Sequence, residues 1–170
     1  MIALDISVEA QGWSGLPEAE ALAQQAAEAA IAAHGGPGAD NEAREAREAC
    51  EACEVGVLLT DDARIRDLNR SWRGKDTPTN VLSFPAPENP GVHFPRYLGD
   101  LALAYETLAR EAEDESKPLA HHFAHLVVHG VLHLLGHDHE VEDEAQLMEA
   151  LEVKALATLG IADPYRDMAA

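Results

Sequence analysis

The chain has 170 residues, the length of one domain with a sizeable hydrophobic core. Its formal net charge of −19, from 31 acidic and 12 basic residues, repels polyanions at long range and argues mildly against a nucleic acid as partner. Because the chain shows neither an apolar run long enough to span a bilayer nor a basic-then-apolar leader, we expect a cytoplasmic protein with no membrane partner.

The first part of the chain predicts a strand, a helix and a second strand. Apolar and polar residues alternate over residues 2–8, which is typical of a half-buried strand. Pro17 favours the start of a helix, and the alanine-rich residues 18–33 are predicted to form it. Trp13, in the turn before this helix, is expected to pack back onto the core. The second strand is predicted at 54–60.

An acidic stretch, residues 40–53, separates the first helix from the second strand. It repeats Glu-Ala-Arg and Glu-Ala-Cys triplets and contains no large apolar residue, so a solvated helix or a loop is predicted. Cys50 and Cys53 form a C-x-x-C pattern, but neither a second such pair nor a histidine pair adjoins it. We therefore assign this stretch no chemistry.

The next predicted helix, over 63–72 with its cap at Asp61, leads into a loop with two cations, Arg73 and Lys75. The planar fork of an arginine meets phosphate oxygens in pairs, so Arg73 is a candidate phosphate clamp. Lys75 is a weaker candidate for the same substrate contact. The alternative interpretation of both residues is an ordinary surface salt bridge.

The second half of the chain predicts two strands and three helices. The strands are predicted at 81–84 and 101–104, with an irregular proline-rich connection between them. A short helix at 106–113, a long helix beginning at Pro118 and a last helix at 142–159 follow. The apolar residues of the last helix recur at helical spacing: Leu147, Met148, Leu151, Ala155 and Leu159.

The long helix carries a metal-binding pattern, H-x-x-x-H-x-x-G-x-x-H, formed by His129, His133 and His139. Histidines four residues apart lie on one helix face about one turn apart, so both imidazoles can reach one metal ion. Gly136 permits a left-handed turn that ends the helix and lets His139 bring a third nitrogen to the same ion. Three protein ligands leave a fourth position for water, which is the pattern of a catalytic zinc.

Other histidines precede this pair on the same helix, and a histidine on an apolar helix is more often a hydrogen-bonded core residue than a ligand. A row of residues spaced by four drifts around a helix by about 40° per step, so the earlier histidines cannot face the same ion. We predict that His125 is a core or supporting residue. His121 and His122 are expected to be partly exposed.

Gly130 separates this pattern from that of zinc peptidases, which carry a glutamate at the corresponding position as general base. Its absence argues against a peptidase and for another reaction at a similar metal. Asp138, next to the third histidine, is a candidate to orient a ligand imidazole.

Four motifs between residues 55 and 165 carry a resemblance to a known family. They are W-R-G-K-D-x-P-T-N-V-L-S-F-P at 72–85, L-G-D at 98–100, the histidine motif at 129–139, and L-G with D-P-Y at 159–165. On these motifs the chain resembles the YbeY family of rRNA maturation factors, which are single-strand-specific endoribonucleases. The first and third motifs are long and specific.

The resemblance implies an α+β, zincin-like fold, with helices packed on a small mixed sheet of about four strands. The chain would be a single domain over 1–170, with an acidic insertion at 35–53. His129, His133 and His139 match the family's ligands for one zinc ion (Zn²⁺) per chain. Arg73 matches the arginine regarded as essential for RNA cleavage.

The implied function is a zinc-dependent endoribonuclease, a hydrolase that acts on precursor rRNA at the 3′ end of the small-subunit rRNA and in ribosome quality control. The implied partners are rRNA and the small ribosomal subunit, with ribosomal proteins or assembly GTPases as further candidates. The electrostatic potential of the cleft would be set at close range by zinc, Arg73 and Lys75. Salt screens the effect of acidic residues that lie more than about 8 Å away.

Three questions stay open at this point. His137 stands where the family usually has tyrosine, and it offers either an alternative ligand or a different proton inventory. The general base is unassigned, and the nucleophile is either the zinc-bound water or the 2′-hydroxyl of the RNA. The alternative function is a non-catalytic ribosome-assembly factor whose zinc is structural.

Overall fold

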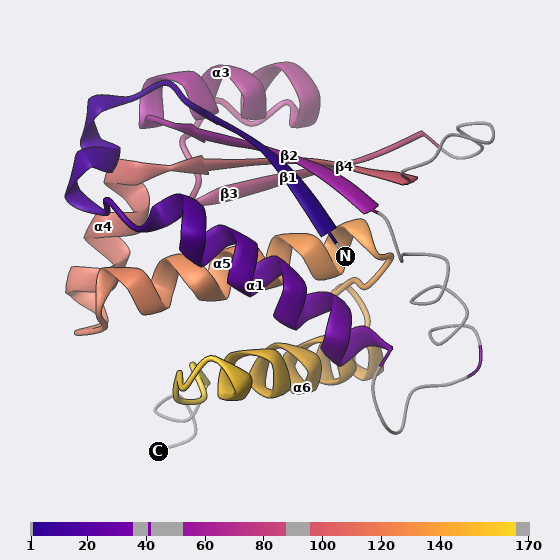
Figure 1. The fold of residues 1–170 in the computed structure, drawn as a ribbon. Coiled ribbons are helices and arrows are strands. Elements are labelled where there is room, and N and C mark those ends of the chain that lie inside the picture. The colour runs from indigo at the N-terminus through magenta and orange to yellow at the C-terminus, as the bar shows by residue number, and fades with distance from the viewer. Residues whose placement is uncertain (1, 36–40, 42–52, 88–95, 166–170) are drawn as a thin grey trace.

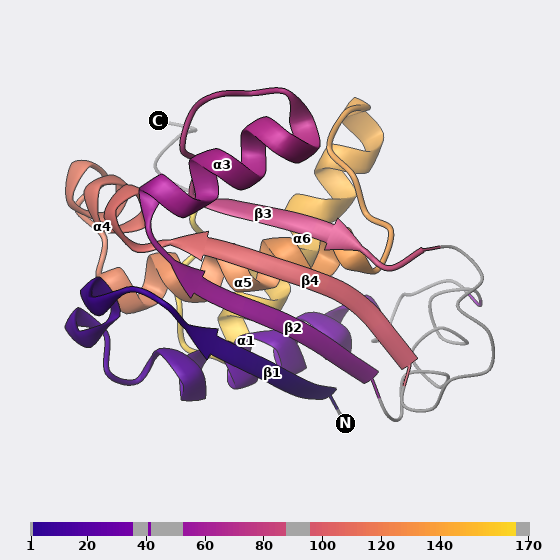
Figure 2. The same ribbon diagram turned by 90° about the horizontal axis from the view of Figure 1, so that it is seen from above.

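The protein is built on a four-stranded mixed sheet, seen in a computed structural model that describes residues 2–35, 41, 53–87 and 96–165. The strands are β1 (Ile2–Val8), β2 (Cys53–Thr60), β3 (Val81–Pro85) and β4 (Arg96–Ala104). Their order across the sheet is β1-β2-β4-β3 (Figure 2). β1, β2 and β4 are parallel, and β3 runs antiparallel to β4 at one edge. The predicted α+β fold with a small mixed sheet is confirmed.

Helices cover both faces of the sheet (Figure 1). On one face lie α1 (Ala19–His34) and α5 (Leu119–Leu134), with α6 (Glu142–Thr158) packed against both on the side away from the sheet. α3 (Asp62–Arg73) lies on the opposite face, and α4 (Tyr105–Asp114) follows β4 at the end of the sheet. A short 3-10 helix, η1 (Gln11–Gly15), joins β1 to α1.

α5 is the central helix of the larger core because it is apolar nearly all round. Six of its side chains are 0% exposed: Phe123, Ala124, Val127, Val128, Val131 and Leu132. A helix buried on most of its sides between the sheet, α1 and α6 holds its polar side chains in fixed surroundings. The histidines of α5 therefore start from a rigid support.

Most predicted elements are confirmed, including the buried Trp13, which is 3% exposed. β4 is the main difference, since it begins at Arg96 rather than at residue 101. Its first half pairs with β2 across a register shift between Glu54 and Val55, a tertiary contact that local sequence does not encode. Leu147, expected on the apolar stripe of α6, is 54% exposed.

The prediction that His122 is partly exposed was wrong. Its side chain is buried, and its Nε2 lies 3.0 Å from Oε1 of Glu111 on α4. α4 packs over this end of α5 and supplies both the cover and the polar partner. His121 is exposed, as expected.

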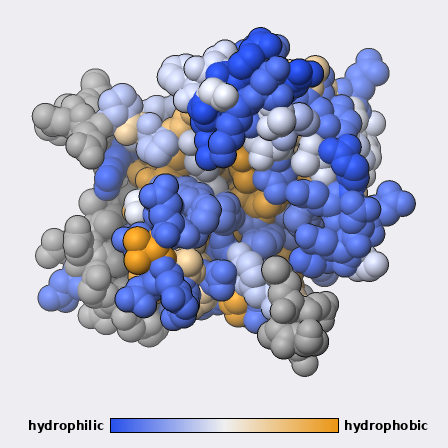
Figure 3. Space-filling model, turned by 180° about the vertical axis from the view of Figure 1, so that it is seen from behind, coloured by the Kyte–Doolittle hydropathy of each residue, from blue (hydrophilic) through white to orange (hydrophobic). Residues whose placement is uncertain are grey.

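The predicted acidic insertion lies largely outside the described residues, which include only Gly35, Asn41 and Cys53 of that stretch. Seen from the side opposite Figure 1, polar residues cover most of the surface, and apolar residues show mainly in the hollows between them (Figure 3). None of the described helices is both long and apolar enough to cross a membrane.

Candidate metal centre

The structure brings His129, His133 and His139 together at the C-terminal end of α5. One ring nitrogen from each lies within 4.8 Å of the others, and the two Nε2 atoms of His129 and His133 are 3.1 Å apart. Gly136 has a φ of +99°, the left-handed conformation that ends the helix and turns the chain back. His139 thereby reaches the two helix histidines from the following turn.

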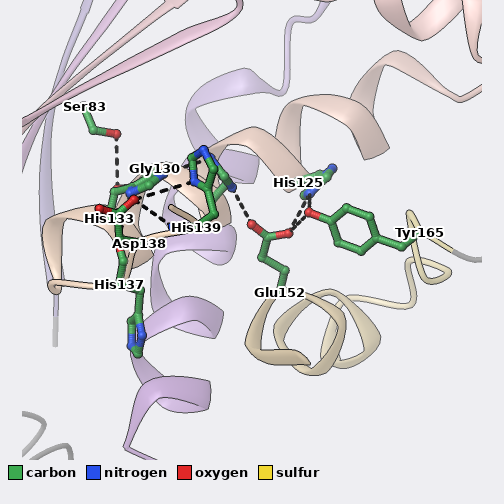
Figure 4. A network of polar contacts seen from close by, with 10 residues as sticks. Ser83, His125, Gly130, His133, His137, Asp138, His139, Glu152 and Tyr165 are labelled. Atoms are coloured by element: carbon green, nitrogen blue, oxygen red, sulfur yellow. Dashed lines mark hydrogen bonds and ion pairs between the residues drawn. The ribbon is translucent and has the colours of Figure 1, made fainter. Parts of the chain in front are cut away.

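Glu152, which lies on α6, contacts the histidines of α5 from the neighbouring helix (Figure 4). Its side chain is 1% exposed, and Oε1 accepts a hydrogen bond from Nδ1 of His129. Oε2 lies 3.1 Å from Nε2 of His125 and accepts a hydrogen bond from the hydroxyl of Tyr165. Burial alone would raise the pKa of Glu152, but these three donors outweigh it and lower the pKa to about 2. The carboxylate is therefore a buried, fully satisfied anion.

The other helix histidine is oriented by the backbone. Nδ1 of His133 donates to the carbonyl oxygen of His137 at 2.9 Å, within the turn that ends α5. The amide of His137 in turn donates to the carbonyl of Leu132 at 3.0 Å. The same turn that delivers His139 therefore also fixes the ring of His133.

The hydrogen bonds of His129 and His133 leave the Nε2 lone pair of each ring available to a cation. A carbonyl only accepts, and the Glu152 carboxylate is ionised, so the Nδ1 atoms of His129 and His133 both carry the proton. Their Nε2 lone pairs then face each other at 3.1 Å, an arrangement that a bound cation would stabilise. Burial and the neighbouring His129 and His139 lower the pKa of His133, which favours the neutral form of its ring.

The donor set fits zinc, because neutral imidazole nitrogens are preferred ligands of this ion and three of them leave one position open. The C-terminal end of α5 adds a partial negative charge beside the cluster, which favours a cation there. The residues present therefore could hold the metal that the histidine spacing predicts.

Arg73, the last residue of α3, lines the same cleft of about 670 Å³ as the three histidines. Three features shape its loop. Gly74 takes a φ of +70° and ends α3, and the Nδ2 of the buried Asn69 donates to the carbonyl of Thr77 at 2.9 Å. Asp76 is held by the guanidinium of Arg66 at 2.9 and 3.0 Å. Arg73 itself makes no ion pair with any described residue.

Lys75 is exposed and does not line this cleft. The structure thus brings Arg73 together with the histidines, but not Lys75. Like Arg73, Lys75 forms no ion pair in the part of the chain that the structure describes.

His137, the other open question from the sequence, bonds away from the cluster. Its Nε2 lies 2.8 Å from Nδ1 of His34 on α1, and Figure 4 shows the ring directed toward that helix. His137 therefore ties the turn after α5 to α1, and its side chain is not placed as an alternative ligand.

Gly130 faces the sheet rather than the cleft. A Cβ at this position would lie 2.7 Å from Cδ2 of Leu101 and 3.4 Å from Oγ of Ser83. Leu101 is itself 0% exposed, so a glutamate cannot be accommodated here without displacing the core. The lack of a peptidase-type general base thus has a packing reason.

Comparison with known proteins agrees with this arrangement. The family model described as Endoribonuclease YbeY matches residues 38–160. Endoribonuclease YbeY of Azorhizobium caulinodans is 54% identical over 162 residues, which cover 95% of this chain and 95% of that protein. Endoribonuclease YbeY of Bradyrhizobium diazoefficiens is 51% identical over 167 residues, covering 96% of this chain and 85% of that protein. The chain belongs to the YbeY endoribonuclease family.

The fold agrees with a solved structure as well. The solution structure of TM1509 from Thermotoga maritima superposes with a TM-score of 0.54 at 22% identity, and the match covers 95% of this chain and 98% of that one. At this identity the likeness speaks for the fold alone. The family resemblance and the fold class that the sequence motifs predict are both confirmed.

Two residues of this YbeY-family site were missed in the sequence. Glu152 and Tyr165 hold His129 and His125. Asp138, the candidate from the sequence, accepts from the backbone N of His139 at 2.7 Å, and its Oδ1 lies 4.0 Å from Nδ1 of the His139 ring. One signal was present for Glu152. It lies four residues after Met148 and so occupies the buried stripe of α6, where an acid requires a partner.

Proposed function

We propose that this chain is a zinc-dependent endoribonuclease that cleaves single-stranded precursor rRNA, in maturation of the small-subunit 3′ end and in ribosome quality control. The observation that supports it best is a single cleft lined by three convergent imidazoles and an arginine that forms no ion pair with any described residue. A metal site beside a guanidinium suits a phosphodiester, since both groups act on a phosphate. Membership of the YbeY family supports the same reaction.

His129, His133 and His139 are proposed as the ligands of one zinc ion. When bound, zinc supplies Lewis acidity that polarises a phosphoryl oxygen and favours the ionisation of water. Glu152 and the carbonyl of His137 fix the tautomers of the two helix histidines, so both Nε2 atoms point toward the ion position without a proton. The ligands are thus oriented before the metal arrives.

Arg73 is proposed to hold the scissile phosphate. Its guanidinium has no ion pair to break among the described residues, and it can meet two phosphate oxygens at once. The same group would stabilise the extra negative charge of the transition state at the mouth of the cleft. The loop contacts of Asn69 and Asp76 hold the position of Arg73 before the substrate binds.

The attacking group has two routes, water or the 2′-hydroxyl of the RNA. The chemical nature of the product ends separates them. A 2′,3′-cyclic phosphate would exclude direct attack by water, and a plain phosphate end that forms without a cyclic intermediate would exclude the 2′-hydroxyl.

The small ribosomal subunit, in the cytoplasm, is proposed as the setting of this cleavage. With a net charge of −19, the chain is expected to bind free RNA weakly and with strong salt dependence. Ribosomal proteins or assembly GTPases could supply the affinity that the acidic surface lacks. Tight binding to naked RNA that persists at high salt would contradict this electrostatic argument.

The test is a cleavage assay on single-stranded RNA with Arg73→Ala and a matched control, Lys75→Ala. Both variants lose one cation from the same loop, but only Arg73 lines the cleft. We expect Arg73→Ala to lose cleavage by about 100-fold or more with fold and zinc content intact, and Lys75→Ala to stay close to wild type. A non-catalytic assembly factor with a structural zinc predicts no difference between the two.

A further inference from the structure

Trp72 is the most exposed large apolar residue of the described chain, at 72% exposed. It lies at the end of α3 and immediately precedes Arg73, so the two Cα atoms are about 3.8 Å apart. A tryptophan contributes little to the core at such exposure, and an exposed indole is a common contact for ligands with a flat apolar face. Its position beside the proposed phosphate clamp is therefore informative.

Phe84 on β3 holds the indole in place. The two rings make an edge contact with centroids 5.9 Å apart and an interplanar angle of 64°. An aromatic side chain that is supported on one side and open on the other loses little conformational entropy when a second ring stacks on it. The Trp72 ring is thus a preorganised platform.

The Trp72 platform and the histidine cluster lie on opposite sides of the sheet edge that β3 forms. Trp72 and Phe84 line a pocket of about 540 Å³, Arg73 and the histidines line the cleft of about 670 Å³, and Pro85 lines both. Between them runs β3, which pairs only with β4 among the described strands. An extended single strand of RNA can therefore pass from the cleft over this edge of the sheet to Trp72.

The basic residues around Trp72 suit a polyanion. Five of the twelve basic residues of the chain lie between Arg64 and Lys75. Arg66 and Arg70 are paired with nearby acids, whereas Arg73 and Lys75 have no ion pair in the described structure.

The pocket of about 540 Å³ beside Trp72 has the opposite charge, because Asp5 and Asp100 line it. These carboxylates disfavour a further phosphate. A nucleic-acid strand is expected to end its contacts at the indole.

We propose that Trp72 stacks on the unpaired nucleobase next to the phosphate held by Arg73. This inference rests on the proposed function and adds to it a reason for single-strand preference. A base within a duplex already has both faces stacked, whereas an unpaired base gains by stacking on an aromatic side chain. Trp72 would select for unstacked RNA, and Arg73 would supply the charge.

Fluorescence can report this contact directly, because the chain has two tryptophans in different surroundings. Trp13 is 3% exposed, and its Nε1 donates to the carbonyl of Thr60 at 2.9 Å. A base that stacks on Trp72 should quench the solvent-exposed component of the emission and leave the Trp13 component unchanged. The probe is a short 2′-O-methyl oligouridylate added to the zinc-loaded protein, with its integrity checked on a gel.

Variants separate stacking from charge. Affinity is measured by anisotropy of a labelled oligonucleotide. Trp72→Ala should weaken binding by about 5- to 150-fold without changing the salt slope, while Trp72→Phe should retain most of the affinity. Arg73→Ala should lower the slope of log affinity against log salt by about 0.7. Leu147→Ala removes an exposed apolar side chain that lines neither pocket and should behave as wild type.

The two proposals fail in different ways. Unquenched emission at saturating RNA, or equal affinity of Trp72→Ala and wild type, would overturn the stacking platform even if cleavage is normal. Quenching that Trp72→Ala abolishes would support the platform even if the wild type cleaves no RNA, which would instead refute the proposed function. Equal thermal midpoints of Trp72→Ala and wild type establish that the variant is folded.

Discussion

The carboxylate of Glu152 on α6 binds Nδ1 of His129 on α5, across the contact between the two helices. The bond fixes the tautomer of His129 and turns its Nε2 toward His133 and the cleft. An acid that contacts no substrate therefore sets which nitrogen is offered to the metal. We therefore expect the affinity for zinc to depend on the packing of α6.

Glu152→Gln should weaken zinc binding by about 10- to 100-fold, because a neutral amide supports the imidazole less strongly than a carboxylate. Competition with a chromophoric zinc chelator measures this affinity. Glu144→Gln, which removes an exposed acid from the same helix, is the control and should leave the affinity unchanged. Equal zinc affinity of Glu152→Gln and wild type would show that the carboxylate only fills space.

The stability of the zinc-free protein should depend on Glu152 in acid. Its pKa falls from an ordinary 4.5 to about 2 on folding, so the ionised carboxylate stabilises the fold above pH 4.5. That contribution is lost as the pH falls from 4.5 through 2, by up to about 3 kcal/mol. Urea unfolding across this range should show a smaller loss in Glu152→Gln, and parallel curves for the two proteins would refute the assignment.

Zinc should be released as the pH falls below about 6, because protons compete with the ion for the ligand nitrogens and free histidine titrates near 6.5. The lowered pKa of His133 works against protonation and should keep release below the pKa of free histidine. Metal content after gel filtration at a series of pH values tests this. Full retention at about pH 4 is incompatible with a site made of three histidines.

His137→Tyr, which introduces the residue that the family resemblance implies at this position, should change zinc affinity by less than about twofold. The His137 ring bonds His34 on α1 and takes no part in the cluster, while its backbone carbonyl, which orients His133, is unchanged. Loss of the contact with His34 should cost about 1 kcal/mol of the free energy of unfolding. A large drop in zinc affinity would instead make His137 a ligand.

The sequence predicts the parts of this site that are close together in the chain. His129, His133 and the turn at Gly136 follow from helical spacing and glycine conformation, and Arg73 follows from its chemistry. Glu152 and Tyr165 come from other elements, and their contacts with α5 are set by how α6 and the segment after it pack. Such tertiary contacts leave only a weak local signal.

The same limit explains the errors in the fold. The first half of β4 was missed because its pairing with β2 involves a register shift. The burial of His122 depends on the position of α4, which supplies Glu111. In each case a distant segment decides the state of a residue whose neighbours in sequence predict something else.

The most direct test of the central claim is an anomalous-scattering crystal structure of the zinc-loaded protein. We expect one zinc ion with ring nitrogens of His129, His133 and His139 at about 2.0–2.1 Å, and the Arg73 guanidinium facing it across the cleft. An ion bound elsewhere, a His139 ring beyond coordinating distance, or an Arg73 side chain directed out of the cleft would contradict this account.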